Sequence, residues 1–187
     1  MSRILGPAVH QAYVYRDFDA ALARFAAGGI GPFYLLESVG GKSLYRGELH
    51  ELSMSAAFVY SGECCFEIIS PIGAQQSTYA EFLERNPEGG LHHIAYYSDD
   101  FAATLEALAD AGMPMRIVQD FEIEIYCEPV GVDNPVCFQF IKRGLFDGWF
   151  GAMRDAAANW DGSEPMRDAR PLMAAAMEKA GGAAHTS

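Results

Sequence analysis

AVHQAYVYRDFDAALARFAAGG (residues 8–29) decides the fold of this chain, because a similar stretch, LHHIAYYSDDFAATLEALADAG (91–112), follows 83 residues later. Eight positions match at this one offset. A repeat of this kind indicates two copies of one supersecondary unit. The matched pairs are His10 and His93, Ala12 and Ala95, Asp17 and Asp100, Phe18 and Phe101, Ala20 and Ala103, Leu22 and Leu105, Phe25 and Leu108, and Gly29 and Gly112.

Each copy begins as a strand and continues as a helix. An apolar run precedes Asp17 and Asp100, and each aspartate stands where a helix N-cap accepts hydrogen bonds from backbone amides. Apolar residues then recur at helical spacing up to Gly29 and Gly112, and glycine favours the left-handed end of a helix.

Three strand-like runs follow each helix. They cover 44–52, 53–60 and 64–70 in the first copy and 115–121, 122–129 and 135–141 in the second. The last runs contain similar segments, CFEII (65–69) and CFQFI (137–141), at an offset of 72 residues. Each copy is therefore predicted to be a βαβββ module.

The composition excludes several classes of protein. The 187 residues carry 13 Lys plus Arg against 25 Asp plus Glu, and this net charge of −12 opposes binding to nucleic-acid phosphates. No apolar run approaches the roughly 20 residues of a bilayer helix, and the N-terminus lacks a secretory pattern. The four cysteines have no CxxC spacing, which favours reduced, buried thiols. We expect a soluble, cytoplasmic protein with no nucleic-acid or membrane partner.

Four polar residues are predicted to share the concave face of the sheet. Side chains alternate along a strand, so His10 and His93 point to equivalent sides, and Glu67 and Gln139 hold equivalent places in the last strands. The same alternation sends His92 to the opposite face.

This set of residues is suited to a divalent metal ion. Two imidazoles, a carboxylate and an amide oxygen can bind Zn, Co, Ni, Mn or Fe and leave positions for water or substrate. Either histidine alone would be read as a hydrogen-bonded core residue, and it is their symmetric placement that favours the metal.

The overall prediction is an α+β fold. Two tandem βαβββ modules (6–70 and 91–143), joined by a linker helix (71–90), form a curved mixed sheet around a metal cavity. Residues 144–187 form a helical extension and a frayed tail, and we expect this extension to pack on the domain or on a second subunit rather than to act as an active-site lid.

Two motifs resemble those of the vicinal oxygen chelate superfamily, which includes glyoxalases, bleomycin resistance proteins and extradiol dioxygenases. They are GLHHIAYYSDDF (90–101) and FEIISP (66–71), with a helix between them. The chain is most similar to methylmalonyl-CoA epimerases, over about residues 6–143. The resemblance implies that each module supplies one ligand from its first strand and one from its last, which are His10, Glu67, His93 and Gln139.

One departure from those epimerases concerns the proton carriers. Their first module often supplies Gln and their second Glu, whereas Glu67 and Gln139 exchange these types. The resemblance implies a metal-dependent isomerase, epimerase or lyase that removes a proton beside a carbonyl through a metal-stabilised enolate, with Glu67 as the base. Gln139 cannot accept a proton, so the candidates for a second proton carrier are Glu48, His50, Glu51 and Glu124.

The substrate is less constrained than the metal. The resemblance implies a CoA thioester, whose phosphates would need a local gathering of cations from Arg16, Arg24, Lys42, Arg46, Lys142 or Arg143. Alternatively, a hydrophobic or aromatic acid could be bound by Phe33, Tyr34, Tyr96, Tyr97 and Tyr126.

Two other functions stay open. Two histidines and one glutamate also suit an extradiol-type ring-cleaving dioxygenase with Fe(II), and some superfamily members are metal-free binding proteins for aromatic compounds. The four-residue ligand pattern favours the isomerase. The expected partners are a small-molecule carbonyl substrate, for which an acyl-CoA is one choice, and a second copy of the chain in a homodimer.

Overall fold

A computed structural model describes residues 4–144 and 146–183. The first module contains β1 (Ala8–Val14), α1 (Phe18–Ala26), β2 (Phe33–Tyr45), β3 (Glu48–Ser61) and β4 (Cys64–Pro71), and α2 (Thr78–Arg85) follows it. The second module contains β5 (Gly90–Ser98), α3 (Phe101–Asp110), β6 (Met115–Asp120), β7 (Glu124–Pro129) and β8 (Cys137–Lys142). The chain then forms α4 (Asp147–Ala158), β9 (Met166–Asp168) and α5 (Arg170–Ala183).

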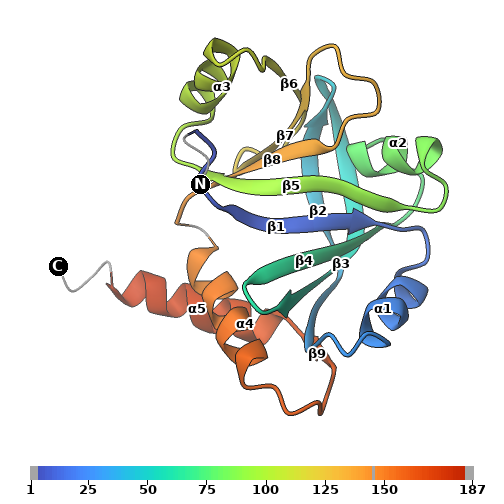
Figure 1. The fold of residues 1–187 in the computed structure, drawn as a ribbon, viewed down its shortest axis with the longest axis vertical. Helices are drawn as coiled ribbons and strands as arrows, with labels where there is room; N and C mark the ends of the chain where they lie inside the picture. The colour runs from blue at the N-terminus through green and yellow to red at the C-terminus, as the bar shows by residue number, and fades with distance from the viewer. Residues whose placement is uncertain (1–3, 145, 184–187) are drawn as a thin grey trace.

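The α+β prediction, with two βαβββ modules and a C-terminal helical extension, is confirmed (Figure 1). The end of the predicted frayed tail, residues 184–187, lies outside the described residues. No helix in the described part of the chain is both long and apolar enough to cross a membrane.

The repeated helices begin and end as their sequences predict. Asp17 accepts a hydrogen bond from the amide of Ala20 at 2.9 Å, and Asp100 accepts one from the amide of Ala103 at 3.0 Å. Gly29 and Gly112 follow the helices with φ of 76° and 85°, a region in which a side chain would be strained.

The sheet closes on itself. Its strand order is β3-β4-β1-β5-β8-β7-β6-β2, and β2 pairs in turn with β3, so that eight strands form a barrel (Figure 1). The modules meet where β1 runs antiparallel to β5, while β4 lies parallel to β1 and β8 lies parallel to β5. The first and last strands of both modules therefore lie side by side, in the order β4-β1-β5-β8.

One predicted strand is wrong. Residues 44–52 were expected to be a single strand, but the chain turns at Arg46 and Gly47, which have φ of 48° and 88°. Leu44 pairs with Leu49 and Tyr45 with Glu48 around this two-residue turn. Positive φ at both central residues is what a tight hairpin requires, and only the second of them is a glycine. The turn joins a long β2, which the sequence analysis missed, to a continuous β3.

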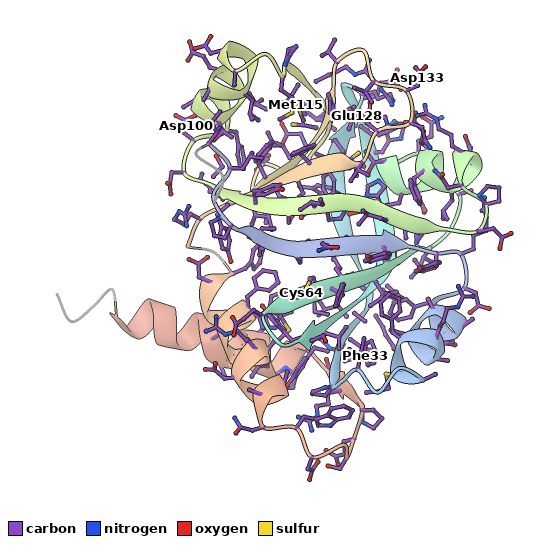
Figure 2. All side chains as sticks on the ribbon, in the orientation of Figure 1. Phe33, Cys64, Asp100, Met115, Glu128 and Asp133 are labelled. Atoms are coloured by element: carbon purple, nitrogen blue, oxygen red, sulfur yellow. The ribbon has the colours of Figure 1, made fainter. Side chains whose placement is uncertain are left out.

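The extension is built into the fold. Strand β9 adds to the edge of β2 in parallel, with Phe33 opposite Met166. Trp149, Phe150 and Met153 of α4 are buried in the largest core cluster. Arg154 of the same helix pairs with Glu63 at 3.6 Å, next to Cys64 at the start of β4 (labelled in Figure 2). Within the described residues, the extension thus packs on its own domain.

This packing predicts a large loss of stability on truncating Met153. Its side chain has no exposed surface, so Met153→Ala should lower the free energy of unfolding by about 2–5 kcal/mol. Urea denaturation followed by circular dichroism would measure the change. The exposed neighbour Arg154 supplies the control, because Arg154→Ala should change stability by about 0.5 kcal/mol or less. Equal effects of the two substitutions would show that α4 does not share the core of the barrel.

Candidate metal centre

Three side chains converge inside the barrel. His10 lies on β1, Glu67 on β4 and His93 on β5. Oε2 of Glu67 lies 3.1 Å from Nε2 of His10 and 3.5 Å from Nε2 of His93, and the two Nε2 atoms are 3.3 Å apart. All three residues are buried, with exposed fractions of 3%, 6% and 0%.

Strand register explains this convergence. Ala12 of β1 lies opposite Glu67 on one side and His93 on the other, and His10 is two residues before it on the same face. Because Ala12 carries only a methyl group, the three longer side chains can reach across it. Ala95, directly opposite His10, leaves similar space from β5.

The donor atoms fit a single divalent cation. Ligands that each lie about 2.0–2.2 Å from one ion are separated from one another by about 3.0–3.5 Å, which is the spacing of the three atoms here. Two imidazoles and a carboxylate suit zinc and the other late first-row metals. His10, Glu67 and His93 could therefore hold such an ion together.

Gln139, the fourth predicted ligand, lies beside this cluster. On β8 it is opposite Ala95, and its Nε2 donates to Glu124 Oε2 at 3.0 Å and to the Tyr126 hydroxyl at 2.9 Å. These two bonds fix the amide, and its Oε1 is buried without a hydrogen-bond partner among the described residues. A buried acceptor of this kind needs a donor or a cation to replace lost water, so Gln139 also fits the predicted ligand set.

The two glutamates of the cavity have opposite electrostatic surroundings. Burial opposes ionisation of Glu67, but hydrogen bonds and charge from His10 and His93 outweigh it and hold its pKa at about 2. Burial and the charge of Glu67 raise the pKa of Glu124 to about 8, against the hydrogen bond from Gln139. At neutral pH the cavity therefore holds one ionised and one protonated carboxyl group.

Of the four predicted second proton carriers, only Glu124 lines the cavity that contains His10 and Glu67. Glu48 and Glu51 are exposed, and His50 and Glu51 line a separate surface hollow. The sequence placed Glu124 among the candidates but could not separate it from the solvated ones.

The prediction for His92 is wrong. It was assigned to the face opposite His93, yet its Nδ1 lies 2.9 Å from Nδ1 of His93, and its ring packs between Tyr79 and Phe82. The register of β1 and β5 skips His92 between the pairs of His93 and Leu91, which marks a β-bulge. The bulge breaks the alternation, and His92 becomes a hydrogen-bond partner that orients His93.

Three of the six basic residues considered for a phosphate-bearing substrate pair with other groups of the chain. Arg16 donates to a backbone carbonyl of α2, Arg46 pairs with Glu81, and Arg143 pairs with Asp99. Of the five aromatic residues proposed to bind a hydrophobic acid, only Tyr126 lines the cavity that contains His10 and Glu67.

Comparisons with known proteins place this geometry in context. Residues 9–123, more than half of the chain, match the family model of the Glyoxalase/Bleomycin resistance protein/Dioxygenase superfamily. The ethylmalonyl-CoA/methylmalonyl-CoA epimerase of Cereibacter sphaeroides is 28% identical over 135 residues, which cover 72% of this chain and 92% of that enzyme.

Two solved structures share the fold. Methylmalonyl-CoA epimerase from Mycobacterium tuberculosis superposes with a TM-score of 0.50 at 16% identity, over 76% of this chain and 91% of the other. A mutant of 4-hydroxymandelate synthase from Streptomyces coelicolor also gives 0.50, at 18% identity, over 74% of this chain and 49% of the synthase. The chain thus spans about half the length of that synthase.

The raised pKa of Glu124 predicts a pH-dependent stability. Unfolded, the carboxyl ionises near its ordinary pKa of 4.5, and folded, near 8, so its contribution to stability is present at low pH and is lost as pH rises between these values. From about pH 5.5 to about pH 8.5, metal-free wild type should lose about 1–3 kcal/mol relative to Glu124→Gln. Guanidinium denaturation of both proteins at both pH values measures this difference. The contributions of all other titrating groups are common to the two proteins and cancel. Parallel pH profiles of the two proteins would contradict the assigned environment.

Proposed function

The chain belongs to the glyoxalase/bleomycin resistance protein/dioxygenase superfamily, and on this basis we propose that it is a metal-dependent isomerase or epimerase. It would move a proton on the carbon beside a carbonyl. The observation that carries the proposal is the approach of His10 Nε2, Glu67 Oε2 and His93 Nε2 to within 3.5 Å of one another inside the barrel, where His10 and Glu67 line a cavity. Similarity to an ethylmalonyl-CoA/methylmalonyl-CoA epimerase supports a 2-substituted acyl thioester as the substrate.

We propose that His10, Glu67, His93 and Gln139 hold the metal, which would be Co, Zn, Ni, Mn or Fe. A bound divalent cation would act as a Lewis acid that withdraws electrons from the substrate's oxygens and so acidifies the neighbouring C–H bond. His92 keeps the His93 ring in place from behind, and Glu124 and Tyr126 do the same for the amide of Gln139.

The two carboxyl groups are proposed to carry the proton. Glu67 is ionised and is the general base that accepts the proton from the substrate carbon. Glu124 is protonated near neutral pH and donates a proton to the resulting anion. The groups come from β4 of one module and β7 of the other, and we propose that they act on different sides of the bound molecule. Reaction of the opposite epimer reverses the two roles and restores both protonation states.

Solvent exchange tests this assignment. In D₂O, protein loaded with Co²⁺ or Zn²⁺ should exchange the α-proton of ethylmalonyl-CoA, followed by proton NMR. Glu67→Gln should bind less metal and lower the exchange rate by about 10²-fold or more. Glu124→Gln should retain the metal and slow the interconversion of epimers by about 10²-fold.

Glu51→Gln is the matched control, since Glu51 is an exposed strand glutamate outside the cavity, and it should behave as wild type. Full activity after treatment with a chelator, or exchange at the wild-type rate in Glu67→Gln, would rule out the proposed mechanism.

One observation favours a second function. Two histidines and one carboxylate on adjacent strands form the donor set typical of non-haem Fe(II) oxygenases. If the chain is a ring-cleaving dioxygenase, Fe(II)-loaded protein should consume oxygen in the presence of catechol, measured with an oxygen electrode. It should then fail to exchange deuterium into acyl thioesters, which separates the two functions.

A further inference from the structure

The cavity above the candidate metal centre has walls of two kinds. Ten of its fifteen lining residues are apolar, and the other five are the polar residues His10, Glu67, Glu124, Tyr126 and Gln139. Among the described residues, no lysine or arginine lines it. A negative charge held away from the metal would therefore lose its water without gaining a counter-ion, which is strongly unfavourable.

Much of the apolar wall comes from the C-terminal extension, outside the family match that ends at residue 123. Phe146, Trp149 and Phe150 reach the cavity from the start of α4, and Met173 reaches it from α5. The Phe150 ring lies 5.7 Å from the ring of His10, between centroids. The extension thus places an aromatic side chain directly against a candidate metal ligand.

This wall is held firmly in place. Backbone hydrogen bonds join Phe33 to Pro165 at 2.7 Å and Ala169 to Leu35 at 2.9 Å, on either side of β9. Trp149 and Phe150 pack edge-on against Phe58 of β3, with ring centroids 4.9 and 5.6 Å away. These contacts between the barrel strands and the extension helices define the shape of the cavity wall.

The cavity is small. Its volume of about 160 Å³ is close to that of an engineered apolar protein cavity that binds benzene, and is below the range of pockets that enclose whole drug-sized ligands. One compact group can be buried there, and the rest of a larger substrate must project outside.

We propose that the extension makes this site selective for carbonyl substrates that carry an uncharged apolar substituent, branched alkyl or aryl and up to about the size of benzene, beside their metal-chelating oxygens. The inference rests on the proposed function and extends it to the substrate class. Any charge on the buried part of the substrate is confined to the chelating oxygens, and a charged remainder lies outside the cavity.

Three hydroxamates, each with two neighbouring oxygens, test this selectivity. Acetohydroxamate, benzohydroxamate and succinohydroxamate present a methyl, a phenyl and a carboxylate, and their affinities for Co²⁺-loaded protein are measured by calorimetry and by the visible spectrum of the metal. Benzohydroxamate should bind at least about tenfold more tightly than acetohydroxamate, because the phenyl group is removed from water. Succinohydroxamate should bind no better than acetohydroxamate.

Variants assign this preference to the extension. Trp149→Ala should reduce the phenyl advantage to about threefold or less. Trp160→Phe is the matched control, because Trp160 belongs to the same extension but packs on Gly31 outside the cavity, and it should preserve the full ratio. Met173→Lys, which leaves Trp149 intact, should improve succinohydroxamate binding relative to benzohydroxamate. Equal affinities of the three probes, or an unchanged ratio in both cavity variants, would overturn the inference while leaving the metal centre standing.

A metal-free measurement separates this inference from the proposed function. Fluorobenzene should bind the metal-free protein, as detected by fluorine NMR, whereas trifluoroacetate should not, and Trp149→Ala should weaken fluorobenzene binding. If the protein takes up no metal, the proposed function fails, and this pair of probes still decides whether the cavity accepts an uncharged apolar group. Preference for trifluoroacetate would refute it.

Discussion

The side chains of His10, Glu67 and His93, which are polar and would be hydrated in the unfolded chain, approach to within 3.5 Å of one another in the interior of the barrel. Burial of a carboxylate is unfavourable unless cationic or hydrogen-bonding partners replace its water, and the two imidazoles do this for Glu67. This contact places two requirements on the remaining structure. Strands β4, β1 and β5 must be adjacent, and the residue between the three side chains must be as small as Ala12. Edge-to-edge joining of the two modules satisfies the first condition, and the alanine at position 12 satisfies the second.

The sequence predicted this contact because it depends on regular features. The period of two along a strand and the offset of 83 residues bring His10 and His93 to equivalent places, and the last strands do the same for Glu67 and Gln139. Prediction failed where the backbone departs from regularity. A bulge at His92 and a two-residue turn at Arg46 and Gly47 each depend on local backbone angles, which period-two patterns do not encode. The role of Glu124 could not be singled out either, because its place in the cavity depends on packing between segments that are far apart in the sequence.

The duplicated fold holds an asymmetric site. Both modules place a polar residue at the equivalent position of the last strand, but Glu67 is ionised by two histidines, whereas Gln139 is a neutral amide held by Glu124 and Tyr126. The carboxyl group of the second module, that of Glu124, thus contacts Gln139 and is not itself one of the three groups that converge at Glu67. The two glutamates therefore have different protonation states at neutral pH.

The same asymmetry extends to the walls of the cavity. Long strand β2 pairs with β3 along most of its length but with β6 at only two positions, Leu44 and Tyr45, so the barrel is weakly joined on that side. Strand β9 covers the beginning of β2, and α4 and α5 place apolar side chains behind it. Residues outside the family match thereby shape the space above His10, Glu67 and His93, while strands β1, β4 and β5 position these three side chains.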